Sequence, residues 1–314
     1  MGSKIWLIGA GGMAQDYVRV IKDLNVDFTI IGRGEESAKK CKEATGCEVI
    51  IGGIEKFLYS KPDICTHAIV AVGAEKLFCT TKQLLEYGIS NVLVEKPGAL
   101  NKWQFEELTD LSKKNNANVV IAYNRRFYAS VLKAQEIIKQ DGGVVSFNFE
   151  FTEWSHIIKP LKKGEGVKEK WFLGNSTHMV DLAFYLGGMP KDMCSFTSGS
   201  LDWHPTASNF CGAGICENGI LFNYQANWES AGRWSVEMLT SEHRLILRPL
   251  EQLQIQKRGS IVQEFVETDN NLDKEYKPGL YLQTKKFLEN LVSNMCIVKD
   301  QLKMYTIYSR MANY

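Results

Sequence analysis

The stretch that decides the fold is Lys-Ile-Trp-Leu-Ile-Gly-Ala-Gly-Gly-Met-Ala at residues 4–14. Ile5 to Ile8 are apolar and β-prone and predict a strand, and the glycines after them predict a tight turn that leads into a helix. The turn has the spacing Gly9-x-Gly11-x-x-Ala14. Gly9 permits the turn, Gly11 lets the backbone approach a pyrophosphate, and Ala14 keeps the helix close to the sheet. We therefore expect a dinucleotide-binding turn whose helix N-terminus faces the phosphates.

The residues after the turn support this interpretation. Tyr17, Val18, Ile21 and Leu24 recur at helical spacing. The alternative is an ordinary glycine turn, because short glycine motifs are common. A strand before the turn and a helix after it favour the dinucleotide site.

Composition restricts the class of protein. The chain has 314 residues, 45% hydrophobic and 23% charged, which is typical of a globular protein and long enough for two domains. A net charge of +1 without a basic block argues against nucleic acid or an anionic membrane as the main partner. We see no signal peptide or membrane span and expect a cytoplasmic protein. The eight cysteines have no zinc-ligand spacing, so we expect no metal site.

Apolar runs alternate with helical patterns through Tyr123, which predicts a doubly wound parallel sheet in a domain of residues 1–124. Further strands are expected at residues 28–31, 49–51, 68–72, 91–94 and 119–123. Helices are expected near residues 35–45, 75–87 and 102–115.

Beyond residue 124 the pattern changes to alternation of apolar and polar residues. It is clearest at residues 144–154 and 219–228, and predicts strands with one buried and one polar face. A domain of residues 125–314 should therefore hold an open, mostly antiparallel sheet covered by helices on one face. Its uncovered face would suit a homodimer or homotetramer. Further strands are expected near residues 193–200, 209–216, 233–239, 243–247 and 253–257, and helices near residues 129–140, 279–294 and 299–313.

Three segments make the chain resemble a known family. They are Glu95-Lys96-Pro97, Tyr123-Asn-Arg-Arg-Phe127 and the segment from His178 through Asp181 to Gly188. Together with the glycine turn, they resemble the family of glucose-fructose oxidoreductase, inositol dehydrogenase and rhizopine catabolism proteins, written Gfo/Idh/MocA. The resemblance implies an NAD(P)-dependent oxidation or reduction of a ring hydroxyl or ketone on a sugar, cyclitol or nucleotide-linked sugar.

Lys96 is the first catalytic candidate. It follows a buried strand, and an ammonium beside the nicotinamide can stabilise alkoxide character on the substrate as hydride moves. The alternative is a surface lysine beside a turn. The resemblance places the family's lysine here and implies a cis bond before Pro97.

His178 is the second catalytic candidate. We expect it in the first turn of a helix capped by Asn175 or Ser176, where the helix dipole favours a neutral, proton-accepting imidazole. The family's histidine precedes an aspartate by three residues, matched by Asp181, which we place beside the substrate. The family usually has another aspartate four residues before the histidine, and this chain has Gly174 there. A structural histidine is the alternative.

Cofactor preference should be visible after the second strand, where NAD-specific proteins place an acidic residue. This chain has Arg33 between two glycines, so we expect NADP, with NAD also possible, and Ser37 as a further contact. A solvated turn arginine is the alternative. The expected cofactor contacts are Gly9, Gly11, Gly12, Met13, Arg33, Ser37, Val72, Gly73, Glu95 and Lys96.

The substrate is poorly specified by sequence. Besides Lys96, His178 and Asp181, we expect Arg125 and Trp154 to line its pocket. The lysine-rich residues 156–170 suit an anionic sugar over the active site, or equally form a solvated loop. Because of Gly174, a catalytically silent dinucleotide-binding sensor remains a second interpretation.

Overall fold

Six parallel strands and one antiparallel edge strand form the first sheet. In the computed structural model, which describes residues 5–314, their order is β15-β6-β5-β4-β1-β2-β3. All pairs among β1 to β6 are parallel, and β15 pairs antiparallel with β6. The strands are β1 (Ile5–Ile8), β2 (Phe28–Gly32), β3 (Val49–Ile51), β4 (His67–Val70), β5 (Asn91–Glu95), β6 (Asn118–Ala122) and β15 (Cys296–Ile297).

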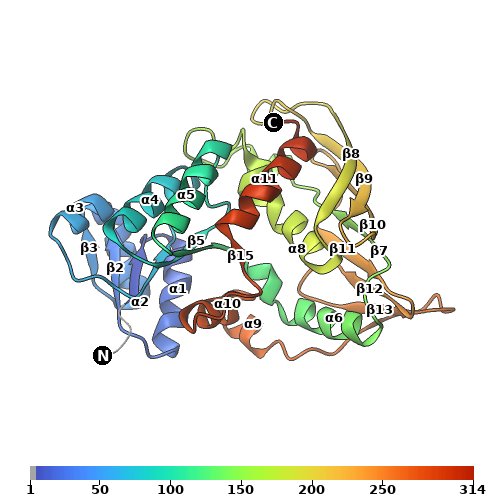
Figure 1. The fold of residues 1–314 in the computed structure, drawn as a ribbon, viewed down its shortest axis with the longest axis horizontal. Helices are drawn as coiled ribbons and strands as arrows, with labels where there is room; N and C mark the ends of the chain where they lie inside the picture. Colours follow the sequence, from blue (N-terminus) through green and yellow to red (C-terminus); the bar gives the residue numbers. More distant parts are fainter. Residues whose placement is uncertain (1–4) are drawn as a thin grey trace. The chain divides into compact units, whose positions relative to one another are not determined.

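Helices cover both faces of this sheet (Figure 1). The helices α1 (Gly12–Asp23), α2 (Glu35–Thr45) and α10 (Leu280–Leu288) lie together on one face. On the other lie α4 (Leu77–Tyr87) and α5 (Lys102–Lys114). The short helix α3 (Gly53–Tyr59), which the sequence did not predict, follows β3. Both faces are covered, so β1 and β4 are buried at every residue.

The two compact units differ from the predicted domains at residue 124 and in one longer segment. The first unit is the chain up to Tyr123 together with Leu280–Met304, and the second is Asn124–Gly279 together with Tyr305–Tyr314. We had expected all residues from 125 to 314 in the second domain. Residues 280–304 belong instead to the first unit, because α10 packs on α1 and β15 extends the first sheet.

Eight strands form the sheet of the second unit, in the order β14-β13-β12-β11-β7-β10-β9-β8. Strands β7 and β10 pair in parallel, and every other pair is antiparallel. The fold is therefore the expected open, mostly antiparallel sheet. The strands are β7 (Ser146–Glu150), β8 (Pro190–Ser198), β9 (Asn209–Cys216), β10 (Leu221–Asn227), β11 (Ser235–Leu239), β12 (His243–Leu247), β13 (Gln254–Lys257) and β14 (Gln263–Phe265).

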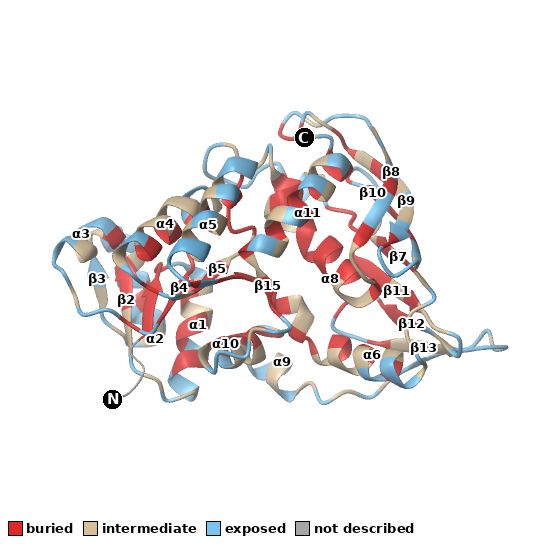
Figure 2. Ribbon diagram, in the orientation of Figure 1, coloured by how far each residue is buried: buried red, intermediate tan, exposed pale blue. Residues whose placement is uncertain are grey.

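Aromatic rings on one face of this sheet pack against a buried helix. Phe147 and Phe149 of β7 and Phe222 of β10 meet Phe184 of α8 (Thr177–Gly187), with ring centroids 4.9–5.9 Å apart. Figure 2 shows α8 as mostly buried. The alternation expected from the sequence is observed, since every second residue of β10 is buried.

Four further helices complete the described chain. They are α6 (Ala129–Gln140), α7 (Ser155–Ile158), α9 (Asn271–Glu275) and α11 (Val298–Ala312). Within residues 5–314, no helix combines the length and apolarity needed to cross a membrane.

Candidate active site

The glycine turn joins β1 to α1 as predicted. Gly9 has φ +130°, and a Cβ there would collide with the backbone carbonyl of Ala71. Gly11 and Gly12 are exposed, and a Cβ at either position would meet nothing within 4 Å. Ala14 is fully buried. The turn therefore needs glycine at position 9 and leaves open space above positions 11 and 12.

The N-terminus of α1 is suited to a phosphate. No side chain caps it, and its first turn holds no acidic residue. The first N–H groups of a helix have no partner within the helix, and the helix dipole favours an anion there. These features fit the pyrophosphate of a dinucleotide.

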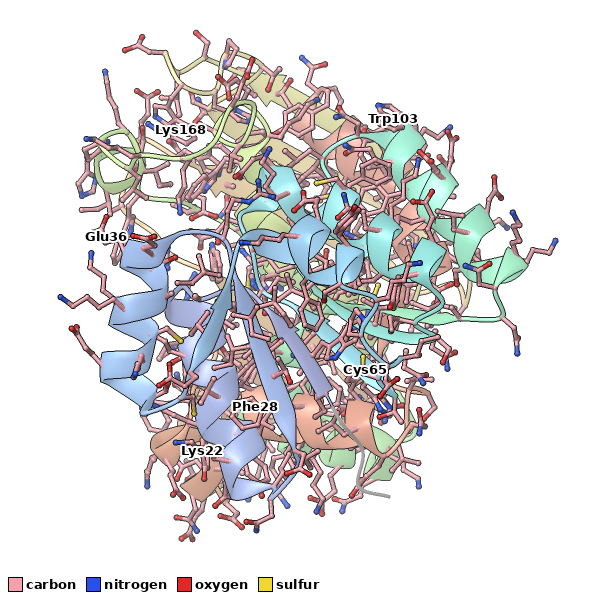
Figure 3. The ribbon with its side chains drawn as sticks, turned by 90° about the vertical axis from the view of Figure 1, so that its left-hand side faces the viewer. Lys22, Phe28, Glu36, Cys65, Trp103 and Lys168 are labelled. Carbon is pink, nitrogen blue, oxygen red and sulfur yellow. The ribbon has the colours of Figure 1, made fainter. Side chains whose placement is uncertain are left out.

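Arg33 lies at the carboxyl end of β2. Figure 3 shows Phe28, which begins β2, and Glu36, in the first turn of α2, at opposite ends of this strand. The Arg33 side chain is 66% exposed, and its Nη2 donates to both carboxylate oxygens of Glu55 at 2.9 and 3.1 Å. Ser37 donates its hydroxyl to the Gly34 carbonyl. Glu55 follows β3 and was missed by the sequence analysis, which expected no carboxylate beside Arg33.

Lys96 directly follows β5, at the same edge of the sheet as the glycine turn, because β1, β4 and β5 are parallel. Its peptide bond to Pro97 is cis, as the resemblance implied. The neighbouring Glu95 carboxylate accepts a hydrogen bond from the Tyr17 hydroxyl at 2.8 Å. Burial and the Glu95 charge raise the pKa of Tyr17 well above its usual value, so this hydroxyl stays a donor. Val72 and Gly73 follow β4 at this edge.

In the second unit, His178 lies near the start of α8 and is 5% exposed. The expected cap was wrong. A π-helical turn, Phe172–Ser176, runs into α8 without a break, and neither Asn175 nor Ser176 caps the helix. Because the helical backbone extends before Thr177, His178 does not lie at a true helix terminus.

The side chains of Asn175 and Ser176 bind a carboxylate instead. Each donates to Glu153 Oε1 at 2.9 Å, and Glu153 is 2% exposed. The other carboxylate oxygen lies 3.7 Å from Nη1 of Arg233. Glu153 thus links the segment after β7 to the turn before His178. It is 22 residues or more from both donors along the chain, and no sequence spacing pointed to it.

Asp181 lies one helical turn after His178 and is paired with an arginine. Its two oxygens accept from Nε and Nη2 of Arg126 at 2.8 and 2.6 Å. Only 4% of the Asp181 side chain and 12% of the Arg126 side chain are exposed. Burial raises the pKa of Asp181, against the charge and hydrogen bonds of Arg126, which lower it. The carboxylate that we expected beside the substrate therefore anchors α8 to Arg126.

Arg125 and His178 lie beside Trp234, which precedes β11, and Trp154 lies beside the preceding Arg233. The Cζ of Arg125 lies 4.5 Å from the centroid of the Trp234 ring, and the His178 ring lies 6.2 Å from it. The Arg233 Cζ lies 4.8 Å from Trp234 and 4.7 Å from Trp154. Trp154 donates its indole N–H to the carbonyl before Arg233, at 2.9 Å. Arg233 and Trp234 were not found by sequence analysis, because no motif marks them.

Several lysines of residues 156–170 contact other residues of their own unit. Lys159 pairs with Asp202 at 2.7 Å, and Lys168 donates to the Lys159 carbonyl. Lys170 lies over the Tyr314 ring at 3.9 Å. These contacts favour a loop held by its own domain. Among the described residues, no three histidine, cysteine or acidic side chains gather to hold a metal ion.

Comparison with known proteins gives a family match over the first domain. Residues 3–123 match the oxidoreductase family with an NAD-binding Rossmann fold, Gfo/Idh/MocA. The uncharacterized oxidoreductase YhhX of Escherichia coli is 32% identical over 131 residues, which are 40% of this chain and 35% of that protein. The chain thus matches about a third of the length of this curated relative.

Solved structures match over the whole chain. A levoglucosan dehydrogenase in complex with NADH and L-sorbose has a TM-score of 0.79 and 16% identity, over 99% of this chain and 95% of the other. A dehydrogenase from Clostridium difficile has a TM-score of 0.79 and 20% identity, over 100% and 99%. UDP-N-acetylglucosamine 3-dehydrogenase from Acidithiobacillus ferrooxidans has a TM-score of 0.76 and 13% identity, over 100% and 97%. At these identities the matches show the fold, which confirms the predicted fold class.

Proposed function

We propose that this chain is a hydride-transferring enzyme, because residues 3–123 match the oxidoreductase family with an NAD-binding Rossmann fold, Gfo/Idh/MocA. Its substrate is a ring hydroxyl or ketone of a sugar, cyclitol or nucleotide-linked sugar. The observation that carries the proposal is the position of Lys96, at the sheet edge that also holds the glycine turn. Ligands of doubly wound sheets bind at this edge.

In the proposed reaction the nicotinamide, when bound, supplies or accepts the hydride. Lys96 holds the substrate oxygen and stabilises the negative charge that develops on it. In oxidation His178 takes up the hydroxyl proton as the neutral imidazole, and in reduction it returns this proton as the imidazolium. Glu153 binds the turn before His178, and Asp181 anchors the helix that carries His178 to Arg126.

We propose NADP as the preferred cofactor, with NAD accepted more weakly. Arg33 is exposed at the end of β2, and its planar guanidinium suits a 2′-phosphate. Glu55 already pairs with Arg33, so a 2′-phosphate has to compete with this carboxylate. We therefore expect a moderate preference.

A second copy of this chain is the proposed partner of the open sheet face. Phe196 of β8, Ile215 of β9 and Leu221 of β10 are 67%, 37% and 60% exposed. Ile215 and Leu221 are direct partners across the strand pair, so their side chains lie on the same face. A homodimer, or a homotetramer, through this sheet would cover them. Light scattering of Leu221→Glu against the unmodified chain tests this, and equal masses would contradict it.

The alternative is a dinucleotide-binding sensor without catalysis. Gly174, in place of the family's usual aspartate, favours it, whereas Lys96 and His178 favour the enzyme. The discriminating experiment measures turnover of sugars, cyclitols and nucleotide sugars with NADP and NAD. Turnover of any of them supports the enzyme. Tight NADP binding without turnover on the whole panel would support the sensor.

A further inference from the structure

Two guanidinium groups lie against one tryptophan ring beside His178. The Cζ atoms of Arg125 and Arg233 are 4.5 and 4.8 Å from the centroid of Trp234. Arg125 belongs to the 3-10 turn Asn124–Phe127 after β6, and Arg233 directly precedes Trp234. The cluster thus joins two segments more than 100 residues apart and places positive charge near the His178 ring.

The positive charges of this cluster are incompletely balanced. Arg233 faces Glu153, and the neighbouring Arg126 is paired with Asp181. Within residues 5–314, the Arg125 guanidinium has no hydrogen bond or ion pair, and its contacts are the rings of Trp234 and Tyr128. Burial lowers the pKa of Arg125, and the charge of Arg233 lowers it further, whereas Tyr128, Glu251 and Glu153 raise it. An arginine nevertheless remains charged in a protein.

Two buried donors in the cluster also lack acceptors. The Nε of Arg125 and the indole nitrogen of Trp234 are buried and have no hydrogen-bond partner in the described chain. A buried donor without an acceptor is costly, and a buried cation without a counter-charge is more so. A stacked guanidinium still has N–H groups in its own plane, arranged as a fork that matches a carboxylate or phosphate.

We propose that Arg125, with Arg233 and Trp234, binds an anionic group of the substrate, a carboxylate or a phosphate, near His178. The proposal rests on the proposed function and specifies its substrate class as acidic or phosphorylated sugars. An uncharged hydroxyl would add no counter-charge beside Arg125. The charge is therefore what distinguishes this class from neutral sugars.

The test uses pairs of sugars that differ in charge. D-glucuronate is compared with D-glucuronamide, and D-glucose 6-phosphate with D-glucose, by titration of the NADPH-bound full chain. We expect the anionic member of at least one pair to bind about 10-fold more tightly or better, since charge-assisted hydrogen bonds are the stronger ones. The pair that discriminates tells carboxylate from phosphate.

Variants assign the effect to Arg125. Arg125→Gln should abolish the difference within the pair, and Arg125→Lys should retain part of it, because lysine keeps the charge without the fork. Arg258→Gln, at an exposed position of the same unit, should leave the difference unchanged. Thermal unfolding confirms that each variant is folded. If Arg125→Gln does not fold, the test uses Arg125→Lys instead, together with the salt dependence of the affinity difference within the pair.

Equal binding within both pairs, or a difference that survives loss of Arg125, would overturn the proposal. Turnover with NADP, measured alongside, separates this failure from failure of the proposed function. Oxidation of neutral sugars as fast as anionic ones would leave the enzyme assignment standing and reject the anion site. Charge-selective binding without any turnover would support the anion site and reject the enzyme assignment.

Discussion

Two arginine–carboxylate pairs show how differently the two units of this protein are built. Arg33 and Glu55 in the first unit are 66% and 48% exposed, whereas Arg126 and Asp181 in the second are 12% and 4% exposed. Both are close pairs with two hydrogen bonds. An exposed pair contributes little stability and opens readily to a ligand, whereas a buried pair cannot lose one partner without leaving a buried charge. The first pair therefore suits ligand selection, and the second holds α8 in place.

The largest effect should follow from breaking the buried pair. Asp181→Ala leaves the Arg126 charge buried and should lower the free energy of unfolding by about 3–5 kcal/mol. Glu55→Ala should cost less than about 1 kcal/mol, because its partner is exposed. Denaturant unfolding followed by tryptophan fluorescence measures both. Equal losses of unfolding free energy in the two variants would contradict the proposed difference between the buried and the exposed pair.

Lys96→Ala tests the cofactor edge of the first unit. Hydride transfer should slow by at least ~100-fold, about 2.7 kcal/mol of activation free energy, because Lys96 meets charge that develops only in the transition state. NADPH affinity should stay nearly unchanged, since the glycine turn holds the pyrophosphate. Single-turnover kinetics and cofactor titration measure the two quantities, with the exposed Lys39→Ala as control. Near-normal hydride transfer in Lys96→Ala would reject the mechanism.

His178→Asn tests the second catalytic candidate, which lies in the second unit. We expect a loss of about 10-fold or more in hydride transfer, smaller than that of Lys96→Ala, because water can share the proton transfer. Single-turnover kinetics on this variant and on the unmodified chain measure the loss. An unchanged rate would make His178 a structural histidine.

The smallest effects should come from the exposed pair. Arg33→Ala should weaken NADPH binding by about 3–10-fold and leave NADH binding unchanged, because it removes the partner of the 2′-phosphate. Glu55→Gln should tighten NADPH binding by about 2–5-fold, because it removes the competing carboxylate. Fluorescence titration of both cofactors measures these ratios. Equal NADPH and NADH affinities in the unmodified chain would refute the assignment of NADP.

The local parts of the fold were predictable from sequence. Apart from α3, the strands and helices from β1 to β6 follow from apolar runs and glycines a few residues apart, and α2, β3, α6, β9 and β12 have the predicted bounds. The segments α3 and β14 were missed because they are too short for a period to show. Residues 280–304 were assigned to the wrong domain because helical periodicity shows which face is apolar, and not which partner covers it.

The residues of the candidate site likewise fall into those that were predictable from sequence and those that were not. Gly9, Gly11, Lys96 and His178 were found in sequence because their roles depend on a turn, a strand end or a local motif. Glu153 beside Asn175, Trp234 beside Arg125, and Glu55 beside Arg33 were not found, because each contact joins separate segments. The sequence by itself determined the local conformations and the motif-bearing positions. The tertiary structure alone decided which charges meet, because a charge is balanced by its neighbours in space and not along the chain.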